Sequence, residues 1–309
     1  MLTASTILSR AHTLTIRNPK LWVFGLFVVG GFNLNFLHFF GFGQFNVHSS
    51  QQAWNVIVSL QQHPARLALA SLLLLVVSVG GLIITNGSRI LLALSVKSIL
   101  DTGTTNVKQQ FKPVKAAFTP VVKISLLTTT CMLALGLVLF AFPLLFVRNT
   151  GYQLLMFAVG GALLLPLAFS MSFLNIFTSF FVIIFKQTFG KAFSQAADLF
   201  MSHWPRLVGF LLILLLIYCG IFVLGATFIF GAQYVIAGLF QAISKLGFEQ
   251  FSAIILIIRI VFALLLWFLV AGLNVFFNAS LLVLFLDLVK PLETEAEAPV
   301  RALTSPTPI

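Results

Sequence analysis

The stretch SLLLLVVSVGGLIITNGSRILLALSVK, residues 71–97, decides the fold of this chain. It is almost wholly apolar, and near its end Asn86 lies eleven residues before Lys97. The same ending occurs twice more, with Asn175 eleven residues before Lys186 and Asn278 twelve residues before Lys290. A helix of about 20 apolar residues crosses the hydrocarbon core of a bilayer. The three endings therefore predict three apolar helices that return to the same side of a membrane.

The composition excludes a water-soluble fold. Hydrophobic residues make up 60% of the 309 residues, charged residues make up 8%, and the mean hydropathy is +1.08. A soluble domain is about 45–50% apolar and about 25% charged. Apolar runs such as 212–217 do not alternate, so they do not indicate the strands of a barrel. The composition predicts an all-α, polytopic helical membrane protein.

We predict about six transmembrane spans in a single membrane domain, residues 1–290. The spans are placed near 21–43, 67–87, 119–147, 153–185, 207–231 and 253–288. The even-numbered spans are longer than a bilayer requires. They tilt, project into the cytosol or break near the asparagines, and the sequence leaves these three alternatives open. Residues 291–309, with three glutamates and three late prolines, are predicted to be a disordered cytosolic tail.

The distribution of cations predicts the orientation. The net charge is +11, and with the N-terminus inside, only Arg66, Arg148 and Lys245 face outward, while Arg259 lies just within the sixth span. Cytoplasmic loops of membrane proteins carry the excess of lysine and arginine. We therefore expect a multi-pass protein of the cytoplasmic membrane with both termini in the cytosol. The positive charge indicates anionic lipid as a partner, and nucleic acid is not expected.

Amphipathic segments accompany the predicted spans. Three of them precede a span on the cytosolic side, near 7–16, 107–118 and 189–200, and each has apolar residues at helical spacing. Two more are expected on the outer side, near 54–60 and 236–246. A helix with one apolar stripe and a basic face lies in the headgroup layer of a membrane. These segments are therefore predicted to be interfacial helices.

The order of segments predicts an internal repeat. The units are residues 1–100, 101–190 and 191–290, and each contains an amphipathic segment, an entering span, an outer connection and a returning span. The first and third units share the openings Pro19-Lys20-Leu21 and Pro205-Arg206-Leu207. Since every unit has two spans, successive units keep one orientation. We predict three parallel hairpin repeats.

The candidate site residues are amides and cations. Asn86, Asn175 and Asn278 carry carboxamides that need hydrogen-bond partners in lipid. They are interpreted either as helix-packing groups that bond one another or as the lining of a polar pathway. The candidate contacts for anionic lipid are Lys108, Lys112, Lys115, Lys186, Lys191 and Arg259.

Catalytic signatures are not found in the sequence. It contains no H-E-x-x-H, G-x-S-x-G or Walker pattern, and its five histidines are scattered. Cys131 and Cys219 fall inside predicted spans and are interpreted as apolar packing residues. We therefore predict no catalytic residues, no metal site, no cofactor and no enzymatic activity.

Two stretches carry a resemblance to a known group. The opening ILSRAHTLTIRNPKLWVFG (7–25) and its counterpart AFSQAADLFMSHWPRLVGF (192–210), followed by long returning helices, resemble bacterial six-span inner-membrane proteins. The arrangement is similar to the membrane domain attached to some glycerophosphodiester phosphodiesterases. The resemblance implies a bacterial, non-catalytic membrane module, and it carries over no site residues. A soluble phosphodiesterase domain has no counterpart here.

Two functional hypotheses follow. The first is a structural or interaction module of the bacterial cytoplasmic membrane that holds anionic lipid, or an unidentified protein partner, at its inner face. The second is a transporter or channel for a small or lipid-like substrate, with the three asparagines along its path. The first predicts that the basic segments contact lipid headgroups. The second predicts a polar cavity that reaches the asparagines from one side.

Overall fold

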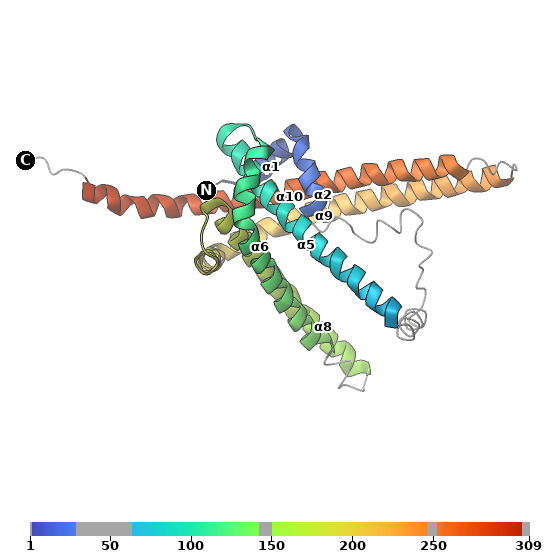
Figure 1. Ribbon diagram of the computed structural model, residues 1–309, viewed down its shortest axis with the longest axis horizontal. Helices are drawn as coiled ribbons and strands as arrows, with labels where there is room; N and C mark the ends of the chain where they lie inside the picture. Colours follow the sequence, from blue (N-terminus) through green and yellow to red (C-terminus); the bar gives the residue numbers. More distant parts are fainter. Residues whose placement is uncertain (1, 29–63, 142–149, 246–251, 305–309) are drawn as a thin grey trace, which may run out of the picture. The chain divides into compact units, whose positions relative to one another are not determined.

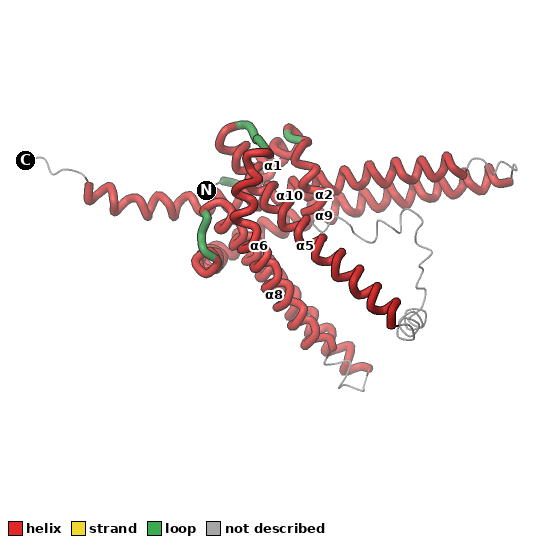
Figure 2. Tube along the Cα trace, viewed as in Figure 1, coloured by secondary structure: helices red, strands yellow, loops and turns green. Residues whose placement is uncertain are grey.

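Apart from short connections, the residues that the structure describes are helical. The computed structural model describes residues 2–28, 64–141, 150–245 and 252–304. These contain seven α-helices, together with the 3₁₀ turn η1 (Pro19–Leu21) and the π turn η2 (Leu137–Ala141) (Figure 2). Most of the first predicted span, 21–43, and the outer segment 54–60 lie outside the described residues.

Five helices are long and apolar enough to cross a membrane, counting only described residues. They are α5 (Pro64–Thr102), α6 (Val107–Gly136), α8 (Thr150–Phe185), α9 (Phe189–Lys245) and α10 (Ser252–Thr304). Two shorter helices precede them, α1 (Ala4–Arg17) and α2 (Trp22–Val28). The predicted class, an all-α multi-pass membrane protein, is thus confirmed.

The returning helices are continuous across the asparagines. Helices α5, α8 and α10 pass through Asn86, Asn175 and Asn278 without interruption. The alternative in which they break at these residues is therefore wrong. Only α8 ends at its marker lysine, where Lys186 has a left-handed backbone (φ 53°) of the kind that closes a helix. Helix α5 continues beyond Lys97 and is closed by Gly103 (φ 76°).

Helix α10 continues far beyond Lys290, to Thr304. The sequence predicted a disordered tail from residue 291, whereas residues 291–304 are helical in the structure. The stretch LETEAEA (292–298) contains three glutamates and two alanines, and both residue types have high intrinsic helix propensity.

The amphipathic segments differ from one another in the structure. Helix α1 forms as expected, but its stripe of Ile7, Ala11 and Leu14 is buried against protein. An apolar stripe can pack on a protein core as well as on lipid. The second segment is part of α6, which continues through two prolines. Membrane helices tolerate proline because neighbouring groups satisfy the freed carbonyls.

The third segment is separated from its span by a kink in α9. His203 has non-helical angles (φ −124°, ψ 16°), and Pro205 follows two residues later. Proline cannot donate a backbone hydrogen bond and its ring crowds the preceding turn. The Ser202 hydroxyl lies 2.8 Å from both the Asp198 carbonyl oxygen and His203 Nδ1. The outer segment near 236–246 does not form a separate helix as far as Lys245, because α9 includes it.

The described residues form two compact units. Unit 1 contains Met1–Leu14, Ile90–Phe210 and Asn278–Ile309, and unit 2 contains Thr15–Arg89 and Leu211–Phe277. In unit 1, α6 and α8 lie side by side as a hairpin, drawn in two greens in Figure 1. The core of this unit is aromatic, because Phe285 of α10 is fully buried among phenylalanines of α8. The ring centroids of Phe181 and Phe285 lie 4.9 Å apart, in an edge-on arrangement.

The core of unit 2 depends on small residues. A side-chain carbon added at Gly25 of α2 would lie 2.2 Å from the Ala271 carbonyl oxygen of α10. The backbones therefore approach more closely than any other residue permits. Asn274 is buried beside this crossing, and its Nδ2 donates to the Gly25 carbonyl oxygen at 2.9 Å. The Trp22 ring covers Gly272, with its nearest atoms 3.3 Å from the added carbon.

Candidate functional site

A pocket of about 380 Å³ in unit 1 is the strongest candidate site. Several separate segments of the chain form its wall. They are Leu2 near the N-terminus, Arg10 of α1, the end of α5 (Lys97, Leu100 and Asp101), Phe185 at the end of α8, and the part of α10 that carries Val283, Leu286, Asp287 and Val289. The pocket therefore lies where α5 and α8 end on the side that the sequence predicts to be cytosolic.

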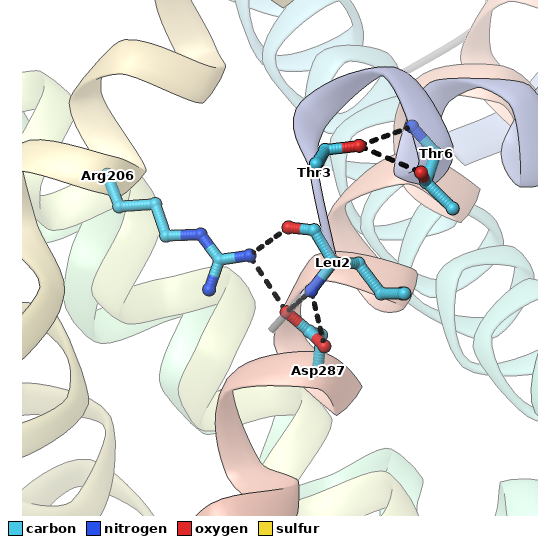
Figure 3. A network of polar contacts seen from close by, with 5 residues as sticks. All are labelled: Leu2, Thr3, Thr6, Arg206 and Asp287. Atoms are coloured by element: carbon cyan, nitrogen blue, oxygen red, sulfur yellow. Dashed lines mark hydrogen bonds and ion pairs between the residues drawn. The ribbon is translucent and has the colours of Figure 1, made fainter.

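Two of the lining residues, Leu2 and Asp287, belong to a polar network (Figure 3). The Leu2 backbone N–H donates to both carboxylate oxygens of Asp287, at 3.1 and 3.0 Å. Arg206 Nη2 donates to the Leu2 carbonyl oxygen at 2.6 Å and to Asp287 Oδ2 at 2.8 Å. The Asp287 side chain is only 9% exposed, and a carboxylate in such a place is stable when it is paired and hydrogen-bonded. The network thus fixes three segments together.

The other charged residues of the pocket, Arg10, Lys97 and Asp101, are more exposed than Asp287. Lys97 and Asp101, one helical turn apart on α5, form an ion pair at 3.0 Å that is largely open to solvent. Arg10 is exposed and makes no hydrogen bond or ion pair with any described residue. Arg10, Lys97 and Arg206 thus face two carboxylates, Asp101 and Asp287. Among these side chains the cations outnumber the carboxylates by one, and Arg10 is the cation that is available to a ligand.

The other wall of the pocket is apolar. Leu100, Phe185 and Leu286 are among its lining residues and are half-buried or exposed at the pocket. A concave site with an apolar lining and a few placed charges binds small ligands that match both features. A singly charged anion with an apolar substituent matches this wall and the unpartnered Arg10 guanidinium together.

The predicted asparagines are distributed over both units. Asn86 on α5 is buried, and its Nδ2 donates to the Leu82 carbonyl oxygen one turn earlier, at 2.9 Å. Asn175 on α8 is half-buried, and its Oδ1 is enclosed without a hydrogen-bond partner among the described residues. Asn278 on α10 is half-buried. Asn86 belongs to unit 2 and the other two to unit 1, so the meeting of all three amides stays a prediction.

The predicted lipid-contacting cations do not line the pocket. Lys112 and Lys115 on α6 and Lys186 and Lys191 near the start of α9 are exposed. Lys108 lies in the first turn of α6 and Arg259 in α10, at positions whose side chains lie outside the described set. Four of the six candidates are therefore accessible to a partner. Their contact with lipid stays a prediction.

Sequence reasoning missed the residues that form the pocket. Lys97 and Arg206 were used only as parts of the repeat pattern, and Arg10, Asp101 and Asp287 were not among the candidate site residues. One signal was present: Asp287 is a lone carboxylate within the last apolar stretch, and a carboxylate there needs a cationic partner. Its partner, Arg206, is 81 residues earlier in the chain and could not be identified from spacing.

Metal-binding and redox groups are sparse in the part of the chain that the structure describes. There, no three histidine, cysteine, aspartate or glutamate side chains gather as metal ligands would. Cys131 and Cys219 are both free thiols. The predicted lack of cofactor, metal and enzymatic activity stays a prediction.

Comparison with known proteins adds no relative. No family model, no curated protein and no solved structure matches this chain. The class follows from the helices alone: the chain is a polytopic helical membrane protein.

Proposed function

We propose that this chain is a non-catalytic module of the bacterial cytoplasmic membrane that holds anionic lipid, or a protein partner, against its inner face. The observation that carries the proposal is the exposure of Lys112, Lys115, Lys186 and Lys191 in unit 1. Each lysine near an anionic membrane surface contributes about 1 kcal/mol to lipid association. No carboxylate among the described residues pairs with these lysines, so their charge is available to phosphate groups.

The proposal includes a topology of six spans with both termini in the cytosol. The five long apolar helices support the assignment of spans two to six. The short apolar helix Pro19–Val28 coincides with the predicted start of the first span. The distribution of lysine and arginine supports this orientation. The threefold hairpin repeat and the resemblance to the membrane domain of glycerophosphodiester phosphodiesterases remain parts of the proposal.

The test is the enrichment of anionic lipid around the full-length protein. The protein is reconstituted into vesicles of phosphatidylglycerol and phosphatidylcholine and then extracted in polymer nanodiscs, and the phosphatidylglycerol fraction of the nanodiscs is compared with that of the bulk membrane. The variant K108E/K112E/K115E is expected to abolish the enrichment. The variant K108R/K112R/K115R keeps the charges and should retain it. Equal phosphatidylglycerol fractions for the wild type and the glutamate variant would refute the proposal.

A transporter or channel is the alternative, and one observation favours it. The enclosed Oδ1 of Asn175 lacks a partner among the described residues, as do the hydroxyls of Thr178 and Ser280 in the same unit. Buried polar atoms without partners cost free energy unless water or a substrate reaches them. N175C, in a background without Cys131 and Cys219, tests this alternative. Modification by a water-soluble thiol reagent would support a pathway, and full protection would support helix packing.

A further inference from the structure

We propose that the pocket formed by Arg10, Lys97 and residues 283–289 of α10 binds a single phosphate ester. This inference rests on the proposed role in holding anionic lipid, and it adds a defined site to the general attraction of exposed lysines. The favoured source of the phosphate is a phospholipid headgroup, because the pocket presents charged and apolar walls side by side. A water-soluble phosphate ester is the other source of the same chemistry.

The charges of the pocket match one monoanion. Asp287 is satisfied by Arg206 and the Leu2 N–H, and Asp101 is paired with Lys97. Arg10 remains as an exposed guanidinium with no described partner. Guanidinium groups bind phosphate through two parallel hydrogen bonds, which are stronger than bonds between neutral groups. A phosphodiester has a single negative charge, which pairs with the Arg10 guanidinium without leaving a carboxylate unpaired.

The lining also offers acceptors for the rest of a headgroup. The carboxylate of Asp101 is 55% exposed, and only its Oδ2 is engaged by Lys97. Its other oxygen can accept a hydrogen bond from a hydroxyl or an ammonium group on the phosphate substituent. Leu100, Phe185 and Leu286 provide the apolar wall. The volume of about 380 Å³ accommodates a headgroup, within the range of small-ligand pockets.

The network behind the pocket positions its wall. Arg206 does not line the pocket, and its contacts are to Leu2 and Asp287. Those bonds fix the N-terminal segment that leads into α1, which carries Arg10. Arg206 is therefore a positioning residue, whereas Arg10 and Lys97 are the residues that we expect to touch the phosphate.

The first arm of the test uses lipid. Full-length protein in detergent is titrated with phosphatidylglycerol, and native mass spectrometry measures the population with one bound lipid. We expect a 1:1 adduct in the wild type. R10Q/K97Q should weaken it at least roughly ten-fold, because charge-assisted hydrogen bonds are lost. K123Q removes an exposed charge of the same unit, on α6, at a lysine that neither lines the pocket nor belongs to the candidate lipid contacts, and its adduct should persist.

A second variant tests the pocket without changing its charge. L100W places a larger ring in the lining and is expected to remove the adduct by filling the cavity. L126W, at an exposed apolar position of α6, is the matched control and should leave the adduct unchanged. Thermal unfolding of each variant shows whether it is folded. Loss of the adduct in R10Q/K97Q and L100W, with unchanged unfolding temperatures, supports the site.

The second arm uses inorganic phosphate, with chloride at equal ionic strength as its reference. If phosphate raises the unfolding temperature of the wild type but not of R10Q/K97Q, and no lipid adduct forms, the ligand is a soluble phosphate. The inference is overturned if neither the adduct nor the phosphate effect depends on Arg10 and Lys97. The proposed function fails separately, through the lysines of α6: K108E/K112E/K115E would then leave lipid enrichment unchanged whatever the pocket variants do.

Discussion

Helix α10 contributes to two joints that are built in opposite ways. In unit 1, its Phe285 is enclosed by the rings of Phe177, Phe180 and Phe181, and its Asp287 is held by charge-assisted hydrogen bonds. In unit 2, the joint consists of a glycine under a backbone carbonyl and one amide hydrogen bond. The joint in unit 1 is formed by large side chains and charges, whereas the joint in unit 2 is formed by a glycine whose lack of a side chain lets two backbones meet.

The difference shows two ways to hold helices without a hydrophobic driving force. Lipid is as apolar as a phenylalanine ring, so helices associate in a membrane through packing and hydrogen bonds. The rings of unit 1 supply many dispersion contacts between helix surfaces that stay apart. The glycines of unit 2 let the backbones approach, so that a side-chain amide reaches a main-chain carbonyl. Substitutions that damage only one joint test this comparison.

The largest effect is expected from F285A. Phe285 is fully buried and its ring contacts several others, so truncation leaves a cavity that α8 cannot fill. We expect a loss of about 3–5 kcal/mol in the free energy of unfolding. Denaturation in mixed detergent micelles measures it. F189A removes an exposed ring of the same unit and is the control. Equal effects of the two variants would contradict the enclosed core.

The second effect concerns the charged part of the same joint. D287N keeps the shape of the side chain but leaves Arg206 without its anion. We expect a loss of about 2–3 kcal/mol in the free energy of unfolding. Breaking a fully buried pair costs about 3–5 kcal/mol, and the cost is lower here because the Arg206 side chain is 27% exposed. D101N breaks the exposed pair with Lys97 and should cost less than about 1 kcal/mol. If both variants cost the same, the network of Figure 3 contributes no more than a surface pair.

The two joints also differ in how far the sequence could predict them. Helical class and membrane residence follow from local composition, and α8 ends beside its marker Lys186 as the pattern indicated. The joints depend on pairs such as Arg206 with Asp287 and Gly25 with Ala271, which lie far apart in the chain. In a sequence that is 60% hydrophobic, apolar faces look alike, so periodicity does not identify which residues meet. The pocket was missed for the same reason.

The third prediction tests the close approach in unit 2. In G25A the new methyl would lie 2.2 Å from the Ala271 carbonyl oxygen and 2.8 Å from Val275 Cγ2, so α2 and α10 must separate. A loss of about 2 kcal/mol is expected from this overpacking. G220A is the control, because a methyl there meets nothing within 4 Å. Trp22 lies at the joint, so its fluorescence reports the change. A stability of G25A equal to that of G220A would mean that the helices do not pack this closely.

The smallest effect separates the hydrogen bond of unit 2 from its packing. N274L keeps the approximate size of the side chain but removes the donor to the Gly25 carbonyl oxygen. Hydrogen bonds between membrane helices contribute about 0.6 kcal/mol on average and up to about 2 kcal/mol, so a loss near 1 kcal/mol is expected. T227V removes a hydroxyl that bonds only within its own helix, and it should leave the joint unchanged. If N274L is neutral while G25A is destabilising, backbone contact alone holds this joint, and the amide only satisfies a carbonyl that water cannot reach. If both are destabilising and their effects are not additive, the close approach exists in part to make the hydrogen bond, since neighbouring groups that act together show such coupling.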